Sequence, residues 1–244
     1  MAKSPISVLK LSRHCVFDLL RLEEALLRTT RRTWCIINDG VPDPAVVMGI
    51  SGKKENLVNV EETKRQGVKL IKRFTGGGTV VLDHNSILVS LICEAEHGPE
   101  VSLFPRPLMK WTETFYQPVF GPHGEFRLSE TDYTFGERKF GGNAQYISKS
   151  RWLHHTSFLW DYDSEKMRCL KHPPKEPVYR EKRSHEDFIL RLSETMPSRG
   201  AFLDSVQDQL REYFDPHTVT LEQARSAADR GKGPALKSTK LIDL

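Results

Sequence analysis

Three consecutive glycines, Gly76 to Gly78, stand between two apolar runs that both have the composition of buried strands. Successive backbone N–H groups in a glycine-rich turn can form a concave site for a carboxylate or a phosphate. Arg73 precedes the glycines and carries a planar fork of donors that suits the same anions. The stretch therefore favours an anion-binding loop over its alternative, a loose glycine-rich hairpin.

The residues after the glycines separate this loop from two other phosphate-binding loops. A Walker A loop needs Gly-Lys-Ser/Thr after its glycines, whereas Thr79 and Val80 follow here. A dinucleotide-binding turn has spaced glycines that open a helix, whereas Val80 to Leu82 continue as a strand. The sequence thus carries neither of these nucleotide motifs at this loop.

A second polar group follows further along the chain, around a predicted tight hairpin at Gly136-Glu137-Arg138. Asp132 precedes this turn and Lys139 follows it, with two glycines close behind the lysine. Glycines let a backbone approach a ligand, which favours Lys139 as a site cation over an ordinary solvated lysine. Asp132 taken alone is equally a turn residue.

The hairpin continues through Asn143 toward a pair of histidines, His154 and His155. Asn143 could offer amide hydrogen bonds to a ribose or a phosphate, with a turn role as the alternative. Neighbouring residues of a strand point to opposite faces, so only one of the two histidines can face a pocket.

Together the two motifs resemble those of the lipoate–protein ligase family, which is related to the biotin ligases. That family carries, in order, a glycine loop, an aspartate, a short hairpin, a lysine with a Gly-Ser/Asn-Ala-Gln element, and a double histidine. The similarity spans most of residues 6–214, and residues 177–185 are similar to a segment of plant-type members. The resemblance implies a class II synthetase-like biotin/lipoyl ligase domain that uses ATP and Mg²⁺, with lipoate as substrate.

In such a ligase the lipoate carboxylate attacks the α-phosphate of ATP, and an acceptor lysine then opens the acyl-AMP. Two anions meet in the first step, so cations are needed beside both. The resemblance implies that Lys139 is the catalytic cation and that Asp132 binds Mg²⁺ or the nucleotide. The implied lipoate- and ATP-binding residues are Arg73, Thr75, Gly76, Gly77, Gly78, Asp132, Gly142, Asn143, Ala144 and His155.

Two positions depart from the pattern of the family. Leu82-Asp83 stands where many members have a His-Asp pair, and Phe74 replaces a small polar residue. Phe74 adds an apolar wall that would suit a medium-chain acyl tail.

Three other functions are weighed against the ligase. An octanoyltransferase would take its acyl group from acyl carrier protein through a cysteine, but residues 116–150 contain none and Cys169 lies beyond the histidine strand. A biotin ligase would carry a Gly-Arg-Gly-Arg type of loop, which is absent. A non-catalytic module that binds lipoate or lipoylated domains stays open, and lipoate-dependent ATP–pyrophosphate exchange would distinguish it.

Composition limits the class of protein. The 244 residues carry a net charge of +4 with no evident nucleic-acid patch, and no run approaches the roughly 18 apolar residues of a membrane span. The four cysteines lack metal-ligand spacing and indicate reduced thiols. We expect a soluble intracellular protein without nucleic-acid or membrane partners. The lack of a visible presequence favours the cytoplasm, with the mitochondrion as the alternative.

The elements that must position these residues form an α+β pattern, with a mixed, largely antiparallel sheet flanked by helices. Adjacent strands in the first ninety-odd residues are expected to be antiparallel. Strands are predicted at 6–11, 34–37, 45–50, 68–71, 79–82, 86–92 and 152–159. Helices are predicted at 17–27, 57–66, from Pro107, from Ser184, and at 202–214.

The domain organisation follows from where this pattern ends. Residues 1–215 are predicted to form the biotin/lipoate ligase catalytic domain, and residues 216–244 a polar, flexible tail. A tail of this size is too short for an accessory domain, so a separate accessory chain is a candidate partner. By resemblance, the other partners are lipoyl acceptor domains, namely those of 2-oxoacid dehydrogenase E2 subunits and the glycine cleavage H protein.

Overall fold

Two sheets form the centre of the molecule. The computed structural model describes residues 3–230 and 238–244. Across the eight-stranded sheet the order is β11 (Phe214–Val219), β1 (Ser4–Ser12), β2 (Trp34–Asp39), β6 (Ser86–Glu94), β10 (Arg151–Leu159), β9 (Arg138–Ile147), β8 (Asp132–Phe135) and β7 (Phe126–Ser129). Across the four-stranded sheet it is β12 (Lys240–Leu241), β4 (Lys69–Lys72), β3 (Ala45–Met48) and β5 (Thr79–Leu82).

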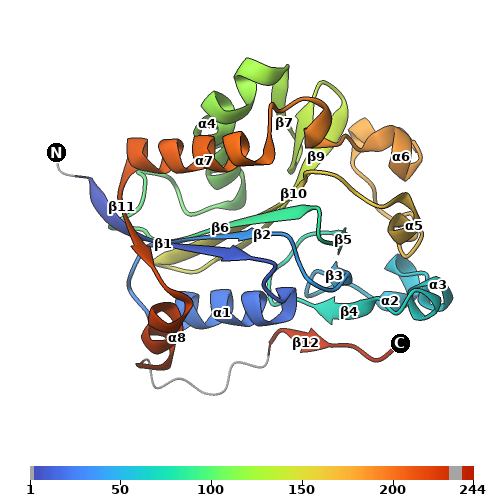
Figure 1. Cartoon of the computed structure of the whole chain (residues 1–244), viewed down its shortest axis with the longest axis horizontal. Helices are drawn as coiled ribbons and strands as arrows, with labels where there is room; N and C mark the ends of the chain where they lie inside the picture. The colour runs from blue at the N-terminus through green and yellow to red at the C-terminus, as the bar shows by residue number, and fades with distance from the viewer. Residues whose placement is uncertain (1–2, 231–237) are drawn as a thin grey trace.

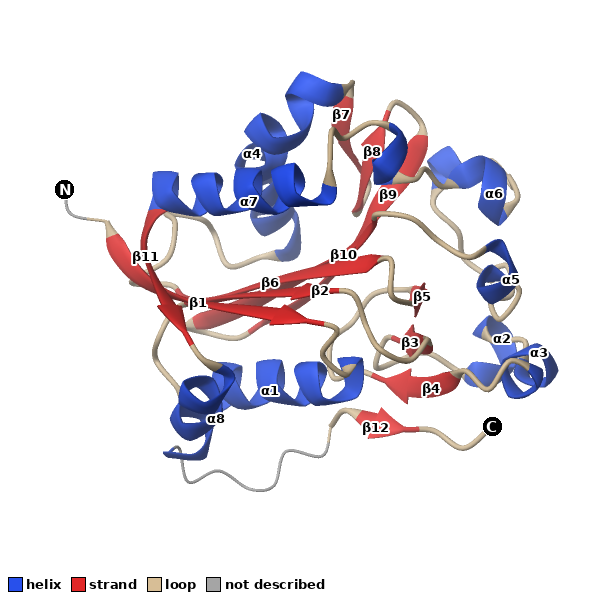
Figure 2. Ribbon diagram, viewed as in Figure 1, coloured by secondary structure: helices blue, strands red, loops and turns tan. Residues whose placement is uncertain are grey.

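Helices cover both faces of the larger sheet (Figure 1). On one face lie α1 (Val16–Thr29) and α8 (Leu221–Arg230), and on the other α4 (Pro105–Phe120) and α7 (Arg199–Tyr213) (Figure 2). The short helices are α2 (Lys54–Leu57), α3 (Val60–Arg65), α5 (Ser164–Met167), α6 (His185–Phe188) and the 3₁₀ helices η1 (Gly121–His123), η2 (Val178–Arg180) and η3 (Leu192–Glu194). Of the helices in the described residues, none is long and apolar enough to cross a membrane.

The larger sheet separates two apolar cores, and alternation along β10 shows the division. Trp152 and Phe158 pack in the core beneath α4 and α7, whereas Leu153 packs in the core beneath α1 and α8. Because both faces are covered, β6 is buried at every residue, which explains its nearly continuous apolar sequence. Most strand pairs are antiparallel, so the predicted α+β class with a mixed, largely antiparallel sheet is confirmed.

Some neighbouring strands run in a direction that we did not predict. The pairs β1–β2 and β3–β4 are parallel, which corrects the expectation of antiparallel neighbours. For β1 and β2 the cause is α1, because a parallel pair needs a crossover connection and this helix supplies it. The helix predicted at 57–66 is divided into α2 and α3, and it stops before Gly67, whose φ is +63°.

The C-terminal residues also differ from the predicted flexible tail over 216–244. β11 pairs with β1 and reaches Val219, and α8 then packs against α1 through Ala224 and Ala228. β12 pairs with β4, and the Ile242 N–H donates to the Leu70 carbonyl at 2.9 Å. The tail prediction is therefore wrong for these segments, and its part at 231–237 lies outside the described residues.

Candidate active site

The glycine loop joins β4 to β5 by passing over the end of β3. Since β3 lies between β4 and β5, the loop is not a hairpin turn between paired strands. The Gly49 N–H donates to the Gly78 carbonyl at 3.2 Å, and the Ile50 N–H donates to the Thr75 carbonyl at 2.9 Å. A Cβ on Gly49 would clash with the Gly77 carbonyl oxygen, so this crossing requires glycine at residue 49.

Arg73 holds the loop from inside. Its guanidinium donates through Nη2 to the carbonyls of Gly76 (2.8 Å) and Gly78 (2.9 Å), and through Nε to Thr75 Oγ1 (2.9 Å). The side chain is buried, and burial lowers its pKa to about 10, against the opposing effect of the Glu23 charge. Arg73 thus remains a cation at neutral pH, but its donors are directed to the loop and, through Nη1, to the Val47 carbonyl on β3 (3.3 Å). These contacts make Arg73 an anchor of the loop, and its role as a direct anion ligand stays a prediction.

The loop meets the larger sheet at β9. Gly77 has φ of +100°, and a Cβ there would lie 2.8 Å from Arg73 Nη2 and 3.2 Å from the Asn143 carbonyl oxygen. Ala144 Cα would be 3.7 Å from the same position. Gly76 and Gly78, by contrast, have open space where a Cβ would stand. The loop therefore has one glycine against β9 and two with open backbone.

Lys139 lies on the same strand, next to Gly142. Its Nζ is 2.9 Å from Asp132 Oδ1, and it would lie 3.3 Å from a Cβ on Gly142. The pairing of β8 with β9 brings Asp132 opposite Gly142, which confirms the predicted hairpin between Asp132 and Lys139. Asp132 Oδ2 accepts a hydrogen bond from the Tyr179 hydroxyl at 2.8 Å. The two carboxylate oxygens are thus both engaged by the protein.

The predicted Mg²⁺ site at Asp132 does not fit this arrangement. Mg²⁺ prefers oxygen ligands, but each oxygen of this carboxylate is already bonded, one of them to an ammonium group. Over residues 3–230 and 238–244, no group of three or more His, Cys, Asp or Glu side chains is arranged to hold a metal ion. The Asp132 carboxylate, as it lies here, therefore does not fit the predicted Mg²⁺ site.

His155 faces the α1 side of the sheet, together with Gly142 and Ala144. Its Nδ1 lies 3.0 Å from Glu23 Oε1 and 2.8 Å from Ser90 Oγ. Glu23 is fully buried on α1, and within the described residues its Oε2 has no hydrogen-bond partner. His155 is thus buried beside a carboxylate, on the face of the sheet where the glycine loop meets β9.

His154 faces the opposite core, as the strand alternation predicts. Its Nδ1 lies 3.1 Å from Gln145 Nε2, and its Nε2 lies 3.1 Å from Asn143 Oδ1. Burial and, to a smaller extent, His155 lower the pKa of His154 to about 3, so the ring is neutral. The Asn143 amide belongs to this network, with Thr156 Oγ1 donating to its Oδ1 at 2.7 Å. The Asn143 side chain therefore points away from the loop, and only its backbone carbonyl approaches Gly77.

Phe74 adds an apolar surface on the α1 side of the sheet, and three of the cysteines are buried. Phe74 is buried, and its ring centroid is 5.9 Å from that of Tyr146 on the α1 side of the sheet. Burial raises the pKa of Cys35 to about 12 and also raises the pKa of Cys93 and Cys169, so these thiols do not ionise readily. The arrangement provides an apolar wall but no reactive thiolate from these three cysteines.

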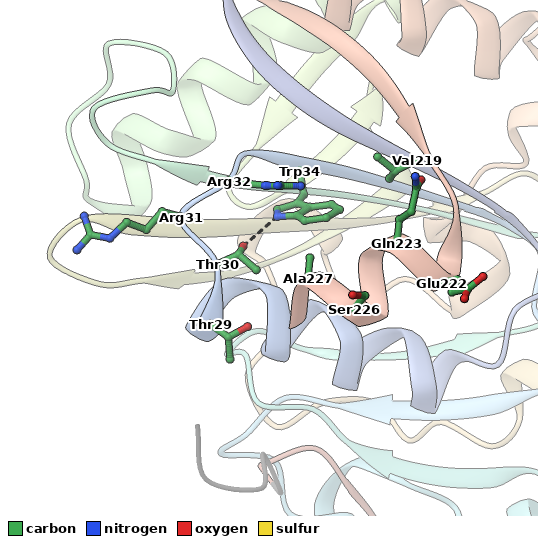
Figure 3. Close-up of a pocket in the computed structure, with 10 residues that line it drawn as sticks. All are labelled: Thr29, Thr30, Arg31, Arg32, Trp34, Val219, Glu222, Gln223, Ser226 and Ala227. Carbon is green, nitrogen blue, oxygen red and sulfur yellow. Dashed lines mark hydrogen bonds between the residues drawn. The ribbon is translucent and has the colours of Figure 1, made fainter. Parts of the chain in front are cut away.

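A separate cavity of about 730 Å³ opens at the C-terminal end of α1 (Figure 3). Its walls come from the last turn of α1, the start of β2, the end of β11, and α8. It shares no residue with the loop or the hairpin, and Trp34 at its back donates through Nε1 to Thr30 Oγ1 at 3.0 Å. The cavity is thus distinct from the candidate active site.

Sequence reasoning missed Glu23, Ser90 and the contact of Tyr179. A readable signal existed for Glu23, because it stands between Leu19 and Leu26 on the apolar stripe of α1. Tyr179 belongs to the segment that we compared with plant-type ligases, but no residue pattern indicated its partner. Without coordinates, Ser90 is indistinguishable from other small residues of a buried strand.

Residues 16–215 match the lipoyl protein ligase A/B catalytic domain family. A Plasmodium falciparum protein named inactive lipoate–protein ligase 2 is 26% identical, over 86% of this chain and 70% of its own length. A Mycoplasma pneumoniae protein named probable lipoate-protein ligase A is 27% identical over 72% of this chain, which spans only 52% of that relative.

Three solved structures share the fold. Protein Ta0514 from T. acidophilum with bound lipoic acid superposes with a TM-score of 0.75 at 18% identity, covering 94% of both chains. Lipoate-protein ligase A bound with ATP has a TM-score of 0.73 at 19% identity, covering 93% of both chains. A bipartite lipoate protein ligase from Thermoplasma acidophilum, studied with its E2 lipoyl domain, has a TM-score of 0.73 at 19% identity, covering 94% of this chain and 92% of the other.

Proposed function

The chain belongs to the lipoyl protein ligase A/B catalytic domain family, and on that premise we propose that it is an ATP-dependent lipoate–protein ligase. It activates lipoate to lipoyl-AMP and transfers the lipoyl group to a lysine of a lipoyl acceptor domain. In the first step a carboxylate oxygen of lipoate bonds to the α-phosphorus of ATP, and pyrophosphate leaves. In the second, the lysine amine attacks the acyl carbonyl, and AMP leaves.

One observation carries the proposal: an ammonium and the glycine loop adjoin on one face of β9. Lys139 Nζ lies over Gly142, and Gly77 lies against Ala144 two residues further along the strand. Alternate residues of a strand are only about 7 Å apart, so the ammonium and the glycine loop are close enough to contact neighbouring groups of one ligand. Lys139 would then stabilise the charge that develops between the two.

The other predicted residues support this arrangement in different ways. Arg73 and Thr75 fix the loop, and Gly76 and Gly78 leave their backbone open to an anion. His155 and Glu23 place polar groups on the same face of the sheet as Phe74 and Tyr146. We assign this face to the acyl group, with MgATP as the second substrate. Lipoyl domains of 2-oxoacid dehydrogenase E2 subunits and the H protein are the proposed acceptors, and an accessory chain is a further candidate partner.

The two alternative functions, an octanoyltransferase and a non-catalytic binding module, are not equally well supported. The octanoyltransferase lacks support, because the thiols of Cys35, Cys93 and Cys169 are buried and raised in pKa. The non-catalytic binding module is the second candidate, because a relative that matches 86% of the chain is named inactive.

Lipoate-dependent exchange of labelled pyrophosphate into ATP tests the ligase, followed by transfer to an apo lipoyl domain, read by mass spectrometry. Exchange and acylation together are expected. Binding of lipoate by calorimetry without any exchange would identify the binding module instead.

A further inference from the structure

A segment after β10 lies across the β8–β9 hairpin, and we call residues 171–190 the strap. In Figure 2 it is the stretch that follows α5 and includes α6, beside β9. Besides that of Tyr179, its hydrogen bonds with the hairpin include Leu190 N–H to the Lys139 carbonyl (2.7 Å), Arg138 Nη2 to the Ile189 carbonyl (2.8 Å) and Arg183 Nη2 to the Glu137 carbonyl (3.1 Å). The Val178 N–H also donates to Glu130 Oε1 (2.6 Å), in the turn between β7 and β8. The strap is thus fixed to the strands that carry the candidate catalytic cation.

Only one of these contacts reaches a side chain of the Asp132–Lys139 pair. The Tyr179 hydroxyl donates to Asp132 Oδ2 at 2.8 Å, while Asp132 Oδ1 lies 2.9 Å from Lys139 Nζ. Burial, and then the charge of Asp132, raise the pKa of the Tyr179 phenol, so it stays protonated and remains a donor. The phenol and the ammonium therefore share one buried carboxylate.

We propose that Tyr179 is a positioning residue that acts on Lys139 through Asp132, an inference that rests on the proposed function. A carboxylate that accepts from a phenol attracts a neighbouring ammonium less than a carboxylate with one free oxygen does. Tyr179 holds Asp132 in the orientation that offers only Oδ1 to the lysine. Lys139 Nζ is then able to turn toward the charge that develops on the α-phosphoryl group.

Removing the hydroxyl should therefore slow the chemical step. Asp132 is 5% exposed, so little water can replace the lost donor at Oδ2. The carboxylate then turns both oxygens toward Lys139 and retains it. One hydrogen bond to a charged group corresponds to a loss of about 10- to 100-fold in kcat.

If Tyr179 had a purely structural role, its ring packing would matter and its hydroxyl would not. The substitution is therefore chosen to delete the hydroxyl alone. The ring of Tyr179 packs on Phe188, with centroids 5.2 Å apart. Tyr179→Phe keeps this packing and deletes only the hydroxyl. Tyr213→Phe is the matched control, because Tyr213 on α7 packs against Trp111 and Phe115, away from the hairpin. The control should leave kcat unchanged.

The test is a double-mutant cycle with Tyr179→Phe and Asp132→Asn, measured by lipoate-dependent pyrophosphate exchange. Tyr179→Phe alone should lower kcat about 10- to 100-fold, with the KM values for ATP and lipoate within about twofold. In the Asp132→Asn background it should have no further effect, since the partner through which it acts is gone. Equal losses in both backgrounds, or no loss in either, would overturn the proposal.

Amide hydrogen exchange of residues 176–183 in the same four proteins keeps this inference separate from the proposed function. If the wild type shows no lipoate-dependent exchange, the proposed function fails while the coupling can still be judged. Each single substitution should then speed amide exchange in the strap, and the double variant should add nothing. Additive increases, or no increase, would show that Tyr179 does not act through Asp132.

Discussion

Lys139→Met removes the charge that we assign to the adenylation step and keeps most of the side chain. Methionine has a similar length and an unbranched stem, so the ammonium is the main group lost. That ammonium lies 2.9 Å from Asp132 Oδ1, and the lysine side chain is 21% exposed. The substitution therefore changes two things at once, namely the charge available to a substrate and the partner of Asp132.

The two effects have different sizes. Loss of one preorganised donor to a developing charge typically lowers the rate about 10²–10³-fold. Asp132 keeps its bond from Tyr179 but loses its counter-charge while only 7% of its side chain is exposed. We expect a loss of about 1–3 kcal/mol in the free energy of unfolding. This exceeds the small change that an exposed hairpin lysine would give. Adding Asp132→Asn should restore the stability without restoring the rate.

The assay is lipoate-dependent pyrophosphate release at saturating ATP, with urea unfolding of each variant in parallel. Lys149→Met, at an exposed position between β9 and β10, is the control for loss of a lysine. Preformed lipoyl-AMP should rescue part of the transfer if Lys139 acts mainly in the first step. Near-normal turnover of Lys139→Met would refute the reasoning. Arg73 could not easily take over, because its guanidinium is bonded to the loop carbonyls.

Three further predictions concern the loop, the histidines and the C-terminal strand. Gly77→Ala should lower the free energy of unfolding by about 1–3 kcal/mol, because φ at this residue is +100° and the new Cβ would crowd Arg73. It should also weaken lipoate binding, as measured by calorimetry. Gly76→Ala is the control and should leave the Tm unchanged, because its Cβ would stand in open space. Wild-type stability should fall as the pH drops from about 6.5 toward about 3, because the unfolded chain protonates His154 first. His154→Gln should lessen this fall by up to ~1.4 kcal/mol per pH unit in urea unfolding, and an unchanged slope would contradict it. Deletion of residues 238–244 should lower the Tm, because β4 loses its pairing with β12.

Local patterns predicted the elements well where a short-range rule decides the structure. Ser184 caps α6, with the Asp187 N–H donating to its hydroxyl at 3.1 Å, as the spacing indicated. The apolar run at 86–92 became the central strand β6. Strand direction was less accessible, because it depends on which elements pair at long range. The α1 crossover between β1 and β2 nevertheless carried that information, and we overlooked it.

The candidate site shows more sharply what could not be predicted from the sequence. The residue types and their order predicted correctly that Asp132 and Lys139 lie close together, because the two strands of one hairpin carry them. They did not tell which way Arg73 would point, since a cation before a glycine loop can bind a ligand or bind the loop itself. The deciding quantity is burial. Arg73 is 5% exposed, and a buried guanidinium must have its N–H groups paired, so it turned to the nearest carbonyls.

Burial of Arg73 in turn accounts for the acidic residue on α1. A buried cation is costly unless an opposite charge lies near, and Glu23 supplies that charge from the apolar stripe of the helix. Glu23 is itself held by Ser90 Oγ at 2.6 Å and by His155 Nδ1 at 3.0 Å. The glycine loop, α1 and the histidine strand are therefore linked electrostatically below the open backbone of Gly76 and Gly78. A neutral residue at position 23 would remove this negative charge from the surroundings of the buried Arg73, so the loop depends on a helix that the sequence places fifty residues before it.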